Sequence, residues 1–122
     1  MIAVAIAAAG FLGAVARYLV DDVVQDRAGP VLPAGTIVVN VSGSLVAGFV
    51  AGLALYHGLG TDAHRVVATG FLGAYTTFST YALDARRLDE ARSRPLAVLN
   101  LAGSVAAGLA AAAAGLALAA AL

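Results

Sequence analysis

The placement of the charged residues constrains this chain more than any other feature of its sequence. Its seven basic and seven acidic residues gather in short clusters, and long stretches between the clusters are nearly free of charge. A helix needs about 20 apolar residues to cross the hydrocarbon core of a bilayer. We therefore expect an all-α integral membrane protein, one domain over residues 1–122, with transmembrane helices at about 2–20, 35–57, 65–86 and 95–122.

Composition narrows the class of protein further. The chain is 61% hydrophobic and 11% charged, whereas soluble domains are about 45–50% apolar and about 25% charged. A buried hairpin from a soluble protein is the weaker alternative, because four spans are present. A net charge of zero argues against nucleic-acid binding. Cysteine is absent, and no nucleophile–base pair or metal cluster is apparent, so we expect no enzyme activity.

Turn-forming residues support these boundaries. Residues 28–30 (Ala-Gly-Pro) interrupt the chain after the first span, and residues 57–60 (His-Gly-Leu-Gly) end the second. Asp62 is predicted to cap the third helix, and Pro95 suits the first turn of the fourth.

The second span carries small and polar residues on one face. Asn40, Ser44 and Gly48 follow one another at steps of four, and Gly48 with Gly52 forms a GxxxG pair. Small residues let membrane helices pack closely, which is the simpler interpretation of the glycines. An amide in lipid is costly unless it is paired or faces water, so Asn40 is a candidate functional residue.

The third span is the most unusual, because residues 70–81 (GFLGAYTTFSTY) combine two glycines with a run of hydroxyl side chains. Those hydroxyls could bond back to their own helix and leave it continuous. Alternatively, the helix breaks near its centre, with Thr77 or Ser79 capping the second half. The freed carbonyl groups would then suit a cation, as in discontinuous transporter helices.

No charge lies at the centre of any span. Arg17 lies within a turn of the first span's end, where it would snorkel to the interface or attract anions to a vestibule. A proton-coupled exporter needs a titrating membrane carboxylate. Hydroxyl, amide and aromatic groups instead suit a passive anion pore.

Three segments, residues 10–18, 35–43 and 70–81, resemble the signature stretches of the CrcB/Fluc fluoride-specific ion channels. Their order and the four-span layout extend the resemblance over nearly the whole chain. It implies a bacterial multi-pass plasma-membrane protein that forms an antiparallel, inverted dimer of dual topology. It also implies a third helix broken at mid-membrane, two fluoride pathways, and passive export of fluoride that has accumulated in the cell as dissociated HF.

The resemblance also assigns residues. Gly73 and Thr76 match the positions whose carbonyls hold a structural Na⁺ that is not transported. Asn40 matches the pore amide, and Arg17 the basic residue of the vestibule. Tyr81 departs from the family's second Phe, which puts the conduction rate and the route past it in question. The other pathway positions are Phe78, Ser79, Thr80, Asn100 and Ser104.

The arginines suggest an orientation and a partner. If the first and third loops share one side of the membrane, that side holds five arginines and the other side holds only Arg65. The positive-inside rule would then place both termini outside. Such a bias conflicts with insertion in both orientations, so the inverted partner is either a second copy or a homologous subunit.

Two other function classes remain open. A small multidrug-type exporter has a similar size, but it would require a membrane carboxylate. A non-conducting membrane assembly subunit would use the small residues for packing alone.

Overall fold

The computed structural model describes all 122 residues, and the chain is helical throughout, without strands. Two long helices are followed by a segment of shorter ones and then a third long helix. In chain order they are α1 (Ile2–Ala28), α2 (Ala34–Tyr56), α3 (Thr61–Arg65), the π-helical η1 (Val66–Leu72), α4 (Gly73–Tyr75), α5 (Phe78–Glu90) and α6 (Arg94–Ala120).

Three of these helices, α1, α2 and α6, are long and apolar enough to cross a membrane. Only 17 of the 122 residues are buried, while large apolar side chains such as Val4, Leu12 and Leu109 are exposed. So small a core would not stabilise a water-soluble monomer, and the exposed apolar surface suits lipid or another subunit. The expectation of an all-helical membrane protein is confirmed at this level.

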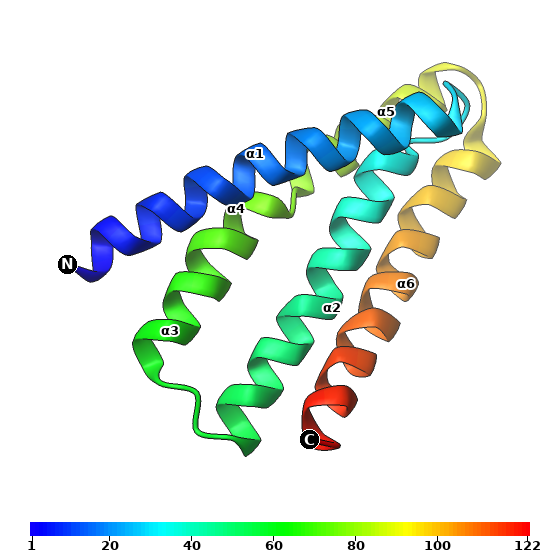
Figure 1. Ribbon diagram of the computed structural model, residues 1–122. Coiled ribbons are helices and arrows are strands. Elements are labelled where there is room, and N and C mark those ends of the chain that lie inside the picture. Colours follow the sequence, from blue (N-terminus) through cyan, green and yellow to red (C-terminus); the bar gives the residue numbers. More distant parts are fainter.

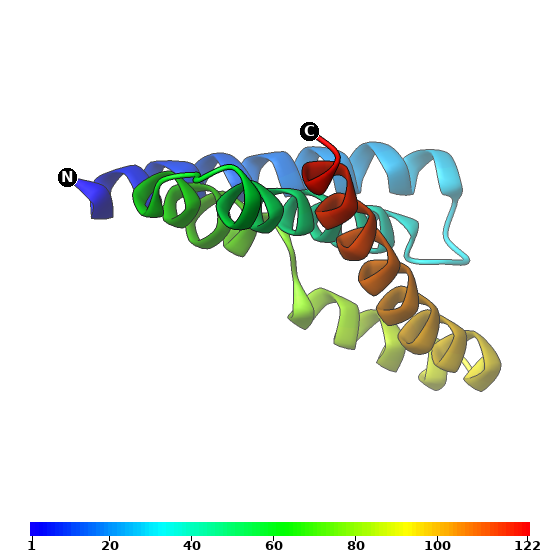
Figure 2. The same cartoon turned by 90° about the horizontal axis from the view of Figure 1, so that it is seen from below.

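The helix α2 lies at the centre of the arrangement. In Figure 1, α6 runs beside α2 on one flank, the α3–α4 segment lies on the other, and α1 crosses above them. Figure 2 shows α5 displaced from the layer of α1, α2 and α3, with α6 running from that layer to α5. The chain therefore changes layer between α4 and α5.

Glycines set the close approach of α2 and α6. A Cβ atom on Gly48 would overlap the carbonyl of Ala112, and one on Gly115 would overlap the carbonyl of Leu45. A Cβ atom on Gly52 would collide with that of Ala119. The packing interpretation of the glycines in the second span is therefore confirmed.

The loops alternate between two ends of the molecule. The α1–α2 and α5–α6 connections lie together at one end of Figure 1, and the α2–α3 connection lies at the other, near the C-terminus. At that end the His57 Nε2 atom is 2.6 Å from the Ala119 carbonyl oxygen, which ties α2 to α6. The first and third loops thus share one end, as the orientation argument requires.

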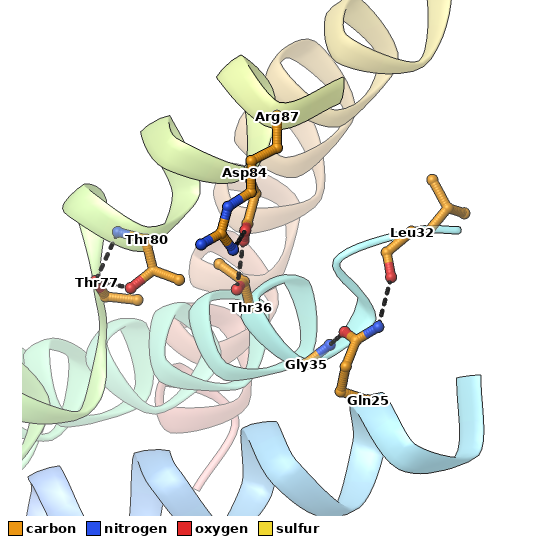
Figure 3. Close-up of polar contacts among 8 residues, drawn as sticks. All are labelled: Gln25, Leu32, Gly35, Thr36, Thr77, Thr80, Asp84 and Arg87. Atoms are coloured by element: carbon orange, nitrogen blue, oxygen red, sulfur yellow. Dashed lines mark hydrogen bonds and ion pairs between the residues drawn. The ribbon is translucent and has the colours of Figure 1, made fainter. Parts of the chain in front are cut away.

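The first helix continues past its predicted end at residue 20 to Ala28. Charge ends the apolar segment but not the helix, because Asp and Arg are compatible with helical turns in water. Gly29, at φ 80°, ends α1. The Gln25 side chain then connects both sides of the loop. Its Nε2 donates to the Leu32 carbonyl, and its Oε1 accepts from the Gly35 amide (Figure 3). The same Nε2 also donates to the Gly29 carbonyl.

Two predictions of helix ends have different outcomes. The predicted cap at Asp62 is wrong, because α3 begins at Thr61 with Gly60 at the cap position and no side-chain cap. Asp62 instead lies in the first turn, where its charge favours the helix N-terminus. Pro95 does lie in the first turn of α6, as predicted.

Between α4 and α5 the backbone leaves the helical conformation for two residues. Thr76 (φ −77°, ψ 156°) and Thr77 (φ −144°, ψ 125°) are extended. Thr77, one of the two predicted caps, caps α5 by accepting a hydrogen bond at its Oγ1 atom from the Thr80 amide, at 3.3 Å.

Candidate functional site

Asn40 binds the chain where it is extended between α4 and α5. Its Nδ2 atom donates to the Thr77 carbonyl at 2.9 Å, and its Oδ1 atom accepts from the Thr77 amide at 2.8 Å. An extended residue inside a helical protein leaves its backbone groups without helical partners. The side-chain amide of Asn40 supplies both partners at once, so α2 stabilises the interruption.

These contacts release two carbonyl groups from their helical donors. In a continuous helix the Thr77 amide would donate to the Gly73 carbonyl, but here it donates to Asn40. The Thr80 amide would likewise donate to the Thr76 carbonyl, but here it donates to the Thr77 side chain. Gly73 and Thr76 are the two residues predicted to hold a cation, and backbone oxygens are suitable ligands for one.

An open groove of about 570 Å³ lies beside this interruption. Segments α2, η1, α4, α5 and α6 all contribute to its lining, which contains no charged side chain. Its polar groups are amides and hydroxyls, such as those of Ser44 and Thr77. Six predicted site residues line the groove: Asn40, Gly73, Thr76, Phe78, Tyr81 and Ser104.

The two aromatic side chains of the groove lie one turn apart on α5. Phe78 is 80% exposed, and its ring centroid is 5.9 Å from that of Tyr81, with the ring planes tilted by 49°. The Tyr81 hydroxyl donates to the Leu101 carbonyl at 2.8 Å. The group that distinguishes Tyr81 from the expected Phe is therefore engaged in a contact between α5 and α6.

On α6, Asn100 and Ser104 have polar atoms without partners. Asn100 is only 4% exposed, and neither its Nδ2 nor its Oδ1 atom has a hydrogen-bond partner; the Ser104 Oγ atom also has none. Buried polar groups normally have hydrogen-bond partners, so these unpaired atoms are positions where a ligand, a water molecule or a second subunit would bind. Ser104 lines the groove and Asn100 does not.

The two remaining pathway hydroxyls lie outside this groove. Ser79 is exposed, with its Oγ atom 3.3 Å from the Thr77 hydroxyl. Thr80 lines a second cavity of about 320 Å³, with Asp84, Thr36 and Arg87 among its neighbours. The predicted pathway residues are therefore not all in one space: Thr80 lines the second cavity, and Ser79 and Asn100 line neither.

The second cavity contains contacts that the sequence did not single out. Thr36 donates to the Asp84 carboxylate at 2.8 Å, and Arg87 lies 3.7 Å from the same carboxylate (Figure 3). Thr36 and Asp84 are 48 residues apart. In the sequence Asp84 stands in the last of the charge clusters, and no spacing rule connects it to the start of the second span.

Asp21 lines the same cavity and follows the charge-poor part of α1 that the sequence predicts to span the membrane, residues 2–20. Burial raises its pKa above the ordinary value of 3.8, and the charges of Asp84 and Asp22 raise it further. Arg17 acts in the opposite direction, so its guanidinium lies within electrostatic reach of Asp21. Arg17 is half-buried and lines neither cavity.

The apolar helices, the loops at two ends and the uncharged groove define a multi-pass α-helical membrane protein. The model of the family described as CrcB-like protein, Camphor Resistance (CrcB), matches residues 4–116. The chain therefore belongs to the CrcB family.

Similar proteins carry one name. The fluoride-specific ion channel FluC 1 of Leifsonia xyli subsp. xyli is 45% identical over 95% of this chain and 85% of its own length. FluC 2 of Mycobacterium bovis is 48% identical over 84% of this chain and 79% of its own length. FluC of Rhodopseudomonas palustris is 44% identical over 89% of each.

This is a family of fluoride ion channels and not of enzymes, so the resemblance and the exclusion of an enzyme are confirmed. A multi-pass bacterial membrane protein is likewise what the helices and the relatives indicate.

Proposed function

We propose that this chain forms a fluoride-selective channel through which cytoplasmic fluoride leaves the cell passively. The names of its relatives support fluoride as the conducted ion, and the uncharged groove supports passive conduction. Fluoride is small and strongly hydrated, so a pore must replace its water with hydrogen-bond donors. Hydroxyls and amides can do this without a fixed charge that would hold the ion too tightly for release.

The single observation that carries this proposal is the pair of contacts that Thr77 makes. Because Asn40 and the Thr77 side chain take the two helical amide donors, the carbonyls of Gly73 and Thr76 are available to a cation. We assign a structural Na⁺ to these oxygens. When bound, it would supply a fixed positive charge near the anion path without being transported.

The pathway would run along the groove past Asn40. One of the two Nδ2 hydrogens of this residue is used by Thr77, which leaves the second as a donor to an anion. Ser104 lines the groove, and its buried hydroxyl has no protein partner. Phe78 presents an exposed ring whose edge is partly positive. Ser79, Thr80 and Asn100 would extend the path beyond it, and Arg17 would attract anions to one mouth.

We further propose that residues 61–90 form one transmembrane segment, broken at Thr76 and Thr77 near the membrane centre. The helical stretch 61–75 is too short to span a bilayer alone. Extended backbone at membrane depth is tolerated only when protein or a water-filled cavity surrounds it. The Asn40 contacts and the groove provide these surroundings.

The groove is open on one side, so one chain does not enclose a pore. We propose that an inverted second subunit closes it and that the two subunits together hold the cation. The chain's arginines favour one orientation: Arg27, Arg86, Arg87, Arg92 and Arg94 belong to the end with the first and third loops. This bias makes a homologous partner of opposite orientation a specific alternative to a homodimer.

Fluoride efflux from liposomes, followed with a fluoride electrode, tests the function. The purified chain is reconstituted alone, and chloride efflux is measured in parallel. Fast fluoride loss with little chloride loss is expected, and it would also exclude obligate pairing with another subunit. Fluoride flux that occurs only when a proton gradient is applied would favour a small multidrug-type exporter. If no flux is seen, either with the chain alone or with the homologous subunit added, a non-conducting assembly subunit would be favoured.

A further inference from the structure

Tyr75, the last residue of α4, is the final helical residue before the interruption. It is buried, and its ring stacks on that of Phe71 with centroids 5.7 Å apart and planes 16° from parallel. Its hydroxyl oxygen is 2.9 Å from the Ser42 Oγ atom of α2. A phenol oxygen buried away from water is costly without a partner, so this contact determines where the side chain rests.

The direction of this hydrogen bond follows from the other contacts of Ser42. The Ser42 Oγ atom is 2.6 Å from the Val38 carbonyl oxygen and 3.2 Å from that of Val39, so its single proton is donated within α2. Because the contact with the Val38 carbonyl is the shortest of the three, we assign the Ser42 proton to it, so that the Tyr75 hydroxyl donates and Ser42 accepts. Removing the serine would leave a buried phenol without an acceptor, whereas removing the phenol leaves Ser42 bonded to its own helix.

The contact is one of three that α2 makes with consecutive residues of the interruption. A Cβ atom at Gly43 would overlap the Thr76 side chain, so Thr76 rests directly on the α2 backbone at that point. Three neighbouring positions of α2 therefore contact residues 75–77 in turn. Ser42 hydrogen-bonds Tyr75, and Gly43 leaves space for the Thr76 side chain. Asn40 hydrogen-bonds both backbone groups of Thr77.

We propose that Tyr75 is a positioning residue for the cation, and that its hydrogen bond to Ser42 fixes the released carbonyls of Gly73 and Thr76 relative to α2. The inference rests on the sodium site of the proposed function. Backbone oxygens are neutral, so they attract a cation only when they lie at the right distance from it. The affinity of such a site therefore depends on how firmly the protein holds those oxygens in place. Tyr75 lies between the two carbonyls in the chain, and its side chain is directed at α2.

The test uses the full chain in lipid nanodiscs, with three variants: Tyr75→Phe, Ser42→Ala and the double variant. The Na⁺ concentration that gives half of the maximal thermal stabilisation is measured, with N-methylglucamine replacing Na⁺ at constant ionic strength. Tyr75→Phe should raise this midpoint roughly three- to tenfold, the range that one neutral hydrogen bond corresponds to. Tyr56→Phe is the matched control, because Tyr56 is 52% exposed and has no hydrogen-bond partner.

The direction of the bond gives a second, sharper expectation. Ser42→Ala should raise the midpoint more than Tyr75→Phe does, because it strands the phenol. The double variant should behave like Tyr75→Phe alone, since no phenol remains to be stranded. Equal and additive effects of the two single substitutions would overturn the assigned direction and with it the positioning role.

A spectroscopic readout separates positioning from simple stability. The chain has four tyrosines and no tryptophan, so near-ultraviolet tyrosine signals are not masked. Na⁺ should change the tyrosine spectrum of the wild type and of Tyr56→Phe, but not that of Tyr75→Phe. An unchanged Na⁺ midpoint in Tyr75→Phe, even with a lower melting temperature, overturns the inference. A wild type that does not respond to Na⁺ would instead overturn the sodium site itself, and the inference with it.

Discussion

Asn40 and Thr77, 37 residues apart, exchange two hydrogen bonds that hold extended backbone against the N-terminal half of α2. An asparagine side chain has one acceptor group and two amide hydrogens, so it can satisfy both backbone groups of Thr77 and keep one donor. The same residue thus has two roles in the proposed channel. It supports the interruption, and it offers an N–H group to the groove.

Substituting Asn40 separates its donor from its acceptor. Asn40→Asp keeps an acceptor for the Thr77 amide but removes the donor to the Thr77 carbonyl and places a negative charge in the groove. Fluoride efflux from liposomes should fall by at least tenfold, because a carboxylate repels the anion and has no N–H group. Stability should fall by about 1–3 kcal/mol, since a buried carbonyl loses its partner. Wild-type efflux in this variant would contradict the proposed role.

The helix cap at Thr77 gives a prediction about stability. Thr77→Val keeps the shape of the side chain but removes the oxygen that accepts from the Thr80 amide. The loss of such a cap costs about 0.5–2 kcal/mol, and the start of α5 beside the Thr76 carbonyl would be held less firmly because the Thr80 amide loses its partner. Thermal unfolding in detergent should show a lower melting temperature and a weaker response to Na⁺. Thr77→Ser should restore both, and a melting temperature for Thr77→Ser as low as that of Thr77→Val would count against the cap.

Tyr81 stands where the family usually has Phe, and the sequence alone does not say what the added hydroxyl does. Its contact with Leu101 makes the role of that hydroxyl testable. Tyr81→Phe removes the hydrogen bond to the Leu101 carbonyl but keeps the ring that lines the groove. Efflux should remain near the wild-type rate, while stability falls by about 0.5–1.5 kcal/mol. Tyr18→Phe, at an exposed position on α1, is the control for loss of a hydroxyl. A large change in efflux would show that the Tyr81 hydroxyl takes part in the pathway.

How far the sequence predicts this structure depends on the range of the interactions involved. Local signals placed the end of the second helix at His57 and the start of the fourth at Pro95, because turn chemistry and proline geometry act within a few residues. The apolar segments identified three long helices, because burial in lipid depends on length and hydropathy. The continuation of α1 through its charges was missed, since charge reports the end of the lipid-facing segment and not of the helix.

Contacts between residues far apart in the chain could not be predicted from the sequence. Thr36 and Asp84, or Ser42 and Tyr75, come together only because α2 packs beside the chain that leaves α4, and neither pair has a local pattern. Tyr75 was hidden in another way, because it resembles an ordinary apolar residue of the span. Ser79 and Thr80 share a motif with Phe78 and Tyr81, but only the latter two line the groove, because residues of one helical turn point in different directions around α5.

The carboxyl group of Asp21 predicts a dependence of stability on pH. Burial and the charges of Asp84 and Asp22 raise its pKa in the folded state above 3.8. A group with a raised folded-state pKa stabilises the protein below its unfolded-state pKa, and that contribution is lost as the pH rises through the folded-state value. Asp21→Asn should therefore flatten the decline of melting temperature with pH above about 4, measured in detergent. Asp26→Asn, at an exposed position of the same helix, should leave the decline unchanged.

Close packing of α2 and α6 can be tested with two glycines on the same helix. A Cβ atom on Gly115 would overlap the Leu45 carbonyl and approach the Phe49 amide, so Gly115→Ala must push the helices apart. Overpacking of this kind costs about 1–3 kcal/mol. A Cβ atom on Gly103 would meet only the Leu99 side chain at an ordinary 3.9 Å, so Gly103→Ala should stabilise α6 by up to about 1 kcal/mol. Melting temperatures of the two variants should move in opposite directions, and a shift of both in one direction would contradict the α2–α6 contact.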